Sequence, residues 1–173
     1  MSERRGLIIV NTGDGKGKTT AALGLAMRAV GSGLKVIMIQ FIKGAWKTGE
    51  QVSAKTLGFE LRPMGEGFTW ITQDRERDTA KAEAAWQYGK TCFFSGDYDL
   101  VILDEINIAL DYEYINLSDV LETLQKRPKD LHVALTGRRA KAELLEIADL
   151  ATEMREIKHP YKKGIKAQKG IEF

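Results

Sequence analysis

Cysteine and histidine are scarce in this 173-residue chain, which contains one cysteine and two histidines. The single cysteine, Cys92, excludes an internal disulfide, and we expect it to pack as a small core residue. Together with His132 and His159 it cannot complete any of the usual zinc ligand sets. The sequence therefore argues against both a disulfide-stabilised scaffold and a zinc site.

Long hydrophobic runs are also missing. No apolar stretch approaches the ~20 residues that a membrane-spanning helix requires. Residues 1–6 lack the apolar region of a signal peptide and lead directly into an apolar run. We therefore expect a cytoplasmic protein without a membrane partner. The net charge of +2 is too small to indicate a nucleic-acid partner by itself, and the length fits one domain spanning residues 1–173.

Short apolar runs alternate with segments of helical spacing along the chain. Buried strands are predicted at 7–10, 36–42, 100–103 and 131–135, with weaker strands at 59–64 and 152–157. Helices are predicted at 22–30, at 78–94, after a cap at Asn116 as far as 127, and at 140–150. The segment 44–73, which holds six glycine or proline residues, is expected to be the least regular part of the chain, and the tail after His159 is also expected to be irregular.

This alternation predicts an α/β fold with a mostly parallel sheet and helices on both faces. In such folds the loops at the carboxyl ends of the strands hold the ligand. Two of those loops carry recognisable chemistry.

The first loop follows the apolar run 7–10 and opens a helical segment, as in a phosphate-binding loop. Its glycines allow consecutive backbone N–H groups to face one anion, Lys18 can reach phosphates, and the Thr19 hydroxyl can ligate Mg²⁺. The usual spacing places a glycine at position 12, which is Thr12 here, so the loop is one residue short when read from Gly13. We predict that a nucleoside triphosphate is bound by Gly13, Asp14, Gly15, Lys16, Gly17, Lys18, Thr19 and Thr20.

The second motif is the apolar run 100–103 followed by Asp104 and Glu105. This Walker B pattern places a carboxylate beside the metal ion held by Thr19, so Asp104 and Glu105 are predicted to act on Mg²⁺ directly or through water. Acids also favour helix N-termini, so the pair could instead begin the next helix. With the glycine loop, the motif predicts a single-domain P-loop fold of the RecA-like type.

Arginines offer further candidates, each with two readings. Arg138 and Arg139 follow the run 131–135 and could contact phosphate oxygens or belong to a solvated loop. Arg28 could contact the nucleotide or face solvent. The sequence contains no Asn-Lys-x-Asp signature for guanine. The residues alone therefore support a single-domain Mg-ATP enzyme and do not specify its reaction.

The wider pattern resembles the CobA-type ATP:corrinoid adenosyltransferases, also called cob(I)alamin adenosyltransferases. The resemblance extends from Gly6 to Phe173, and the shortened glycine loop is itself the form found in that family. Besides the loop, the motifs that carry it are Gln40-Phe41-Ile42-Lys43-Gly44, Gly67-Phe68-Thr69-Trp70, Val101-Ile102-Leu103-Asp104-Glu105, Thr136-Gly137-Arg138 and Gly164-Ile165-Lys166-Ala167-Gln168-Lys169-Gly170-Ile171-Glu172.

The resemblance implies a reaction in which a Co(I) corrinoid attacks the 5′ carbon of ATP and inorganic triphosphate leaves. The triphosphate would lie on the loop in the reversed sense, stabilised by Lys18, Thr19 and Mg²⁺. Phe68 and Trp70 would form a wall against the lower corrin face that displaces the axial base. Spacing alone favours a different interpretation, in which these two aromatics are strand residues on one core face.

The resemblance also implies a homodimer and a reduced flavoprotein as electron donor. Many relatives carry a basic helix before the first strand that closes over the site, whereas only about six residues precede Leu7 here. The lysine-rich tail after Lys158 could cover the site instead, or it could be a solvated end. Whether the corrinoid is cobalamin or cobinamide is left open. A regulatory P-loop ATPase and a small-molecule kinase are the competing functional classes.

Overall fold

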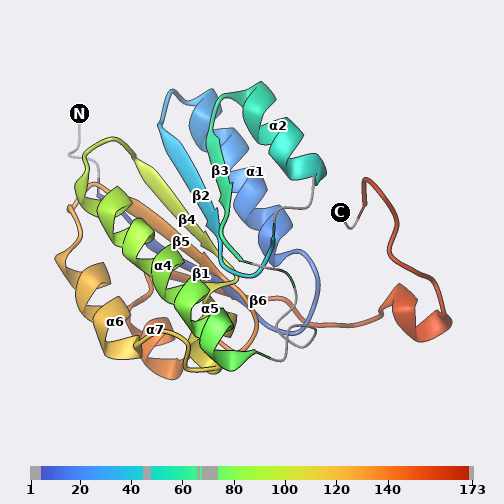
Figure 1. Cartoon of the computed structure of the whole chain (residues 1–173). Helices are drawn as coiled ribbons and strands as arrows, with labels where there is room; N and C mark the ends of the chain where they lie inside the picture. The colour runs from blue at the N-terminus through green and yellow to red at the C-terminus, as the bar shows by residue number, and fades with distance from the viewer. Residues whose placement is uncertain (1–4, 45–47, 66, 68–73, 172–173) are drawn as a thin grey trace.

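A computed structural model describes residues 5–44, 48–65, 67 and 74–171 of the chain (Figure 1). The strands in this part are β1 (Ile8–Thr12), β2 (Val36–Gln40), β3 (Glu60–Pro63), β4 (Leu100–Asp104), β5 (His132–Thr136) and β6 (Leu150–Glu153). They form one sheet in the order β3-β2-β4-β5-β1-β6, and all neighbouring pairs are parallel. The predicted parallel α/β architecture is confirmed.

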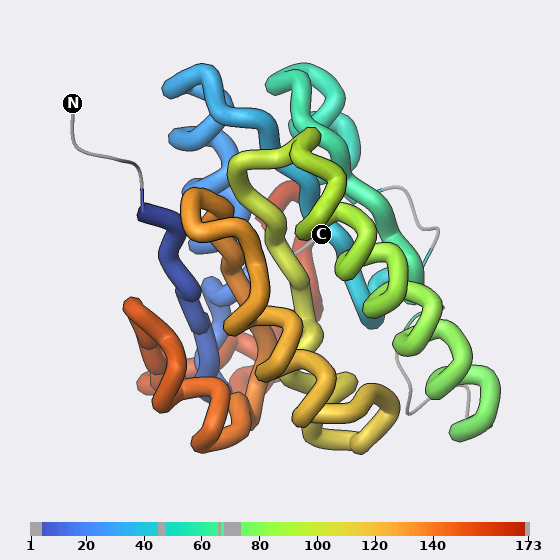
Figure 2. The backbone as a smooth tube through the Cα atoms, turned by 90° about the vertical axis from the view of Figure 1, so that its left-hand side faces the viewer, coloured from blue at the N-terminus to red at the C-terminus, as the bar shows by residue number. Residues whose placement is uncertain are grey.

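Helices cover both faces of this sheet (Figure 1). Their bounds are α1 (Lys18–Gly31), α2 (Gly49–Leu57), α4 (Arg75–Phe94), α5 (Ile106–Asp111), α6 (Leu117–Lys126) and α7 (Ala142–Ile147), followed by the 3₁₀ turn η1 (Pro160–Lys163). Figure 2 shows α4 and α6 beside each other over one face of the sheet. Helices α1 and α2 lie on the opposite face.

The hydrophobic core has two parts, one on each face of the sheet, and successive residues of a strand belong to them in turn. In β2, Val36 and Met38 pack with the alanines of α1, while Ile37 and Ile39 pack with α4 and its buried Trp86. Alternate side chains of a strand point to opposite faces, so an unbroken apolar run is what a sheet covered on both sides requires. Cys92 lies in the α4 layer and is 4% exposed, which confirms the expected core position.

Local capping fixes where two of the outer helices begin. The Asn116 side chain accepts a hydrogen bond from the Asp119 backbone N–H at 3.1 Å, which confirms the predicted start of α6. Asp74 caps α4 in the same way through the Arg77 N–H. The α4 helix therefore begins three residues before the predicted 78, because the Asp74 cap is the physical boundary and the apolar spacing starts later.

The segment 44–73 was predicted to be the least regular part of the chain, with only a weaker strand at 59–64, but Gly49–Leu57 within it forms α2. This helix buries only Ala54 fully, so it has almost no apolar stripe to reveal it. It ends at Gly58, whose φ of 82° is the left-handed conformation that closes many helices. Helix α5 was missing from the prediction because its six residues follow β4 without a loop.

Boundaries elsewhere shift by a few residues. The predicted strand 36–42 ends at Gln40, and the predicted helix 140–150 is limited to Ala142–Ile147. The predicted strand 152–157 is found at Leu150–Glu153, where the side chains are all exposed and no burial pattern marks the strand. None of the helices in the described ranges is long and apolar enough to cross a membrane.

The sheet order brings the two predicted motifs together. Strand β5 lies between β1 and β4, so Thr136 at its carboxyl end separates the loop after β1 from the acids after β4. All six strands run in the same direction, so these ends meet along one edge.

Candidate active site

The glycine loop after β1 packs directly on the residues that follow β6. The Gly15 N–H donates a hydrogen bond to the Met154 carbonyl at 2.7 Å. A Cβ atom on Gly13 would lie 2.5 Å from the same oxygen, and one on Gly15 would lie 2.7 Å from it. Glycine is therefore required at both positions by close backbone approach, in addition to the anion-binding role predicted from the sequence.

Lys18 begins α1 and crosses back over this loop. Its ammonium group donates to the carbonyl oxygens of Gly13 at 2.7 Å and Gly15 at 2.6 Å, and the residue is 7% exposed. Burial lowers the pKa of Lys18, while the nearby Glu105 carboxylate acts in the opposite direction. A phosphate oxygen that took the place of these carbonyls would meet a cation already held at the loop.

Asp104 lies behind the loop and is fully buried. One of its oxygens, Oδ1, accepts hydrogen bonds from the hydroxyls of Thr19 at 2.9 Å and Thr136 at 2.7 Å. Thr19 lines the main cavity, whereas Asp104 does not. This arrangement points the Asp104 carboxylate at the Thr19 hydroxyl proton and leaves the lone pairs of that hydroxyl for another ligand.

Glu105 occupies the other side of the cavity floor. Its φ of 64° is left-handed, an uncommon and strained conformation for a residue other than glycine, and its N–H donates to the Thr136 hydroxyl at 2.9 Å. Burial and the adjacent Asp104 charge raise the pKa of Glu105 to about 7, against the opposing effect of Lys18. The residue is also the N-cap position of α5, which confirms that the acidic pair leads into the next helix.

The donor set here fits a hard divalent cation. Glu105 Oε2 is buried and has no hydrogen-bond partner among the described residues. An unpartnered carboxylate oxygen and the Thr19 hydroxyl offer the oxygen ligands that Mg²⁺ prefers when phosphates supply the others. Asp104, being fully buried, is placed to act through Thr19 and not as a direct ligand.

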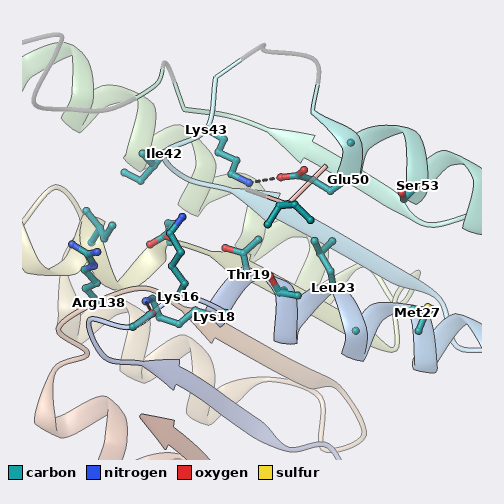
Figure 3. Close-up of a pocket in the computed structure, with 18 of the residues that line it drawn as sticks. Lys16, Lys18, Thr19, Leu23, Met27, Ile42, Lys43, Glu50, Ser53 and Arg138 are labelled. Carbon is teal, nitrogen blue, oxygen red and sulfur yellow. Dashed lines mark hydrogen bonds and ion pairs between the residues drawn. The ribbon is translucent and has the colours of Figure 1, made fainter. Parts of the chain in front are cut away.

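Lys18, Thr19 and Glu105 line a cavity of about 1140 Å³ (Figure 3). Leu23 and Met27 of α1 form an apolar side of it, and Gly170 and Ile171 of the tail also line it. The volume exceeds the range of roughly 300–1,000 Å³ typical of small-ligand pockets. The cavity therefore has room for more than a triphosphate.

An ion pair that the sequence did not reveal lies across the cavity from the loop. Lys43, after β2, and Glu50, on α2, both line the cavity, and the Lys43 ammonium contacts the Glu50 carboxylate (Figure 3). Burial alone would raise the pKa of Glu50, but hydrogen bonds from Lys43 and neighbouring groups bring it below its usual value. Glu50 was missed because α2 itself was not predicted, whereas Lys43 lies in a motif already noted.

The other residues predicted to belong to the site differ in which cavity they line. Gly15, Lys16, Gly17 and Thr20 line the main cavity, and Asp14 lines a smaller neighbouring one. Gly13 contributes its carbonyl to Lys18. The predictions for Phe68 and Trp70 fall outside the described residues.

The arginines are also separated by the fold. Arg138 and Arg139 both line the main cavity, and Arg138 also lines the smaller one. The Arg139 guanidinium is held by Asp111 at 3.1 Å, with its side chain 71% exposed. Arg28 is exposed on α1 and is not among the described residues that line the main cavity. Arg138 is thus the arginine best placed to face a phosphate.

Comparison with known proteins identifies the family. Residues 4–173 match the family described as ATP:corrinoid adenosyltransferase BtuR/CobO/CobP. The chain belongs to this family. By this membership it is an adenosyltransferase enzyme.

Individual relatives can be aligned with this sequence over nearly its whole length. A corrinoid adenosyltransferase of Pseudomonas aeruginosa is 50% identical and covers 99% of this chain and 85% of its own length. The corrinoid adenosyltransferase CobA of Salmonella typhimurium is 47% identical, with 99% and 87% covered. A crystal structure of the RadB recombinase matches in fold alone, with a TM-score of 0.52, 18% identity, and 90% and 77% of the two chains covered. That likeness agrees with the predicted RecA-like P-loop fold.

Proposed function

We propose that this enzyme transfers the 5′-deoxyadenosyl group of ATP to the Co(I) centre of a corrinoid and releases inorganic triphosphate. In this reaction the electron pair of Co(I) forms the new cobalt–carbon bond. The C5′–oxygen bond breaks, and its electron pair leaves with the triphosphate. The observation that carries the proposal is one cavity in which Lys18 and Thr19 form the floor and considerable space remains above them.

In this proposal the loop residues stabilise the charge that grows on the leaving triphosphate. Lys18 exchanges its two carbonyl partners for phosphate oxygens, and the loop N–H groups donate hydrogen bonds to the same anion. Mg²⁺, held by Thr19 and Glu105, would neutralise part of this charge. Asp104 keeps the Thr19 hydroxyl oriented, because it already accepts that hydroxyl's proton.

The reversed placement of the triphosphate is part of the proposal. It directs C5′, and not the γ-phosphorus, toward the second substrate. Holding C5′ near cobalt converts a bimolecular encounter into a positioned attack, which supplies a large part of the rate enhancement. Arg138 lies at the boundary of the two cavities, where it can contact an outer phosphate.

The corrinoid side is assigned to Phe68 and Trp70, which would cover the lower corrin face and displace its axial base. Removal of an axial donor eases the reduction of Co(II) to Co(I). We also propose that the tail covers part of the site, which Gly170 and Ile171 support by lining the cavity. A reduced flavoprotein as electron donor, a homodimer and a cytoplasmic location complete the proposal.

The direct test is anaerobic incubation of the protein with ATP, Mg²⁺ and chemically reduced cobalamin, with cobinamide in parallel. Conversion of the Co(I) spectrum to that of an alkylcorrinoid supports the transferase. The two substrates together report which corrinoid is preferred. ADP formation that proceeds equally without corrinoid would favour a regulatory ATPase, and transfer of the γ-phosphate to a small molecule would favour a kinase.

A further inference from the structure

Gln40, the last residue of β2, lies beside the buried Asp104. The two residues are direct partners across the parallel β2–β4 pair, and Gln40 is 1% exposed. The Gln40 side-chain amide donates from Nε2 to Asp104 Oδ2 at 3.1 Å. Its other end, Oε1, is buried without a hydrogen-bond partner among the described residues.

The chemistry of the pair fixes which way the amide is turned. A carboxylate offers only acceptors, so it must face the NH₂ end of Gln40 and not the oxygen. This orientation leaves Oε1 as a spare acceptor in a buried polar cluster. A spare buried acceptor is costly unless a donor reaches it, and a water molecule held by a metal ion is such a donor.

Three side chains of the described residues donate hydrogen bonds to Asp104, and they do not all reach the same oxygen. The Thr136 hydroxyl donates to Oδ1 and also accepts a hydrogen bond from the Glu105 N–H. The Thr19 hydroxyl also donates to Oδ1. Among the described residues, Gln40 is the one whose side chain donates to Oδ2, the second oxygen of the carboxylate.

The terminal torsion of an aspartate is broad and soft, so one anchored oxygen does not define the plane of the carboxylate. The Gln40 bond supplies the second anchor. With both oxygens held, Oδ1 stays aligned with the Thr19 hydroxyl, and the Thr19 lone pairs keep one direction.

We propose that Gln40 is a positioning residue that locks Asp104 and, through it, the Thr19 hydroxyl in the orientation needed for the magnesium–triphosphate complex. This inference rests on the proposed function, because it assigns the metal to Thr19. It gives a physical role to the glutamine that opens the 40–44 motif. Gln40 does not line the main cavity and acts through Asp104.

The test compares ATP affinity with and without Mg²⁺, measured by calorimetry on the full chain in the absence of corrinoid. Gln40→Met keeps the length of the side chain and removes both hydrogen-bonding groups. We expect its affinity for Mg-ATP to fall about tenfold, the effect of losing one charge-assisted contact. Its affinity for ATP in EDTA should stay within about twofold of wild type, because the loop and Lys18 are untouched.

Thr123→Val is the matched control, because Thr123 is also a buried polar residue but lies on α6, away from Asp104. It should change neither affinity. Equal losses with and without Mg²⁺ in Gln40→Met would show general damage and overturn the proposal. So would an unchanged magnesium dependence. If Gln40→Met does not fold, Gln40→Asn, which withdraws the amide by one methylene, is judged by the same criteria.

The two hypotheses fail separately in this design. If the wild-type protein transfers adenosyl groups but Gln40→Met keeps the normal magnesium dependence of ATP binding, only the proposed role of Gln40 is contradicted. If the wild-type protein forms no alkylcorrinoid, the proposed reaction is contradicted. If the magnesium dependence of ATP binding is nevertheless lost in Gln40→Met, the positioning role of Gln40 remains supported.

Discussion

Replacing Glu105 by glutamine should stabilise the ligand-free protein at high pH while impairing its magnesium-dependent activity. Burial raises the pKa of Glu105 to about 7, above its usual value of 4.5. A carboxyl whose pKa is raised by folding contributes stability that is complete below the unfolded pKa and is lost as pH rises through the folded pKa. The loss therefore falls between about pH 4.5 and pH 7.

The size of the effect follows from the shift. A shift of roughly 2.5 units at 1.36 kcal/mol per unit amounts to about 3 kcal/mol, which is an order of magnitude for a largely buried group. Glu105→Gln removes the titration and keeps the shape. The free energy of unfolding of the variant, minus that of wild type, should therefore be larger by up to about 3 kcal/mol at pH 8 than at pH 5.

The assay is urea denaturation in EDTA at a series of pH values, with Glu122→Gln as the control. Glu122 lies on the exposed face of α6, and its side chain is 61% exposed. Adding Mg²⁺ and ATP should reverse the order at pH 8, because only the wild-type side chain brings a negative charge to the cation. A stability difference between Glu105→Gln and wild type that does not vary with pH would refute the reasoning, as would a difference of the opposite sign.

Three further changes test other parts of the structure. Lys18→Ala should weaken ATP binding at least about tenfold by calorimetry, because a charge-assisted contact is lost, and unchanged affinity in a folded variant would contradict the loop assignment. Phe68→Ala and Trp70→Ala should slow the reaction that starts from Co(II)alamin more than the reaction that starts from prepared Co(I)alamin, and equal losses would indicate core residues. Asp119→Ala should lower the free energy of unfolding by about 1–2 kcal/mol in urea titrations, because the Trp86 indole N–H, which donates to Asp119 at 2.6 Å, loses its partner; a change under about 0.3 kcal/mol would show that water replaces it.

The elements that were predicted well are those whose signal is local. All four apolar runs became buried strands, because a strand covered on both faces must be apolar throughout. The loop and the acidic pair were found because their chemistry requires particular residue types at fixed spacing. Their meeting at one sheet edge followed from parallel topology alone.

The features that were missed depend on tertiary contacts. Helix α2 has one fully buried side chain, so periodicity could not reveal it, and the Lys43–Glu50 pair was lost with it. Strand β6 is exposed and is defined by its pairing with β1. The left-handed backbone of Glu105 is held by the Thr136 hydroxyl, a partner 31 residues away that no local pattern indicates.

The different positions of Asp104 and Glu105 relative to the cavity likewise could not be predicted from the sequence. Both acids fit the motif equally, and only burial distinguishes them. Asp104 is fully buried behind Thr19, while Glu105 lines the cavity. Gln40 shows the same limit, since its role depends on a cross-strand partner 64 residues away.

The most direct test of the central claim is phosphorus NMR of a quenched reaction containing the protein, ATP, Mg²⁺ and Co(I) corrinoid. Attack at C5′ leaves the phosphate chain intact. The account therefore predicts one inorganic triphosphate for each adenosylcorrinoid formed, with little ADP or orthophosphate, and no turnover when the corrinoid is omitted. Stoichiometric ADP, or phosphate release that is independent of the corrinoid, would contradict it.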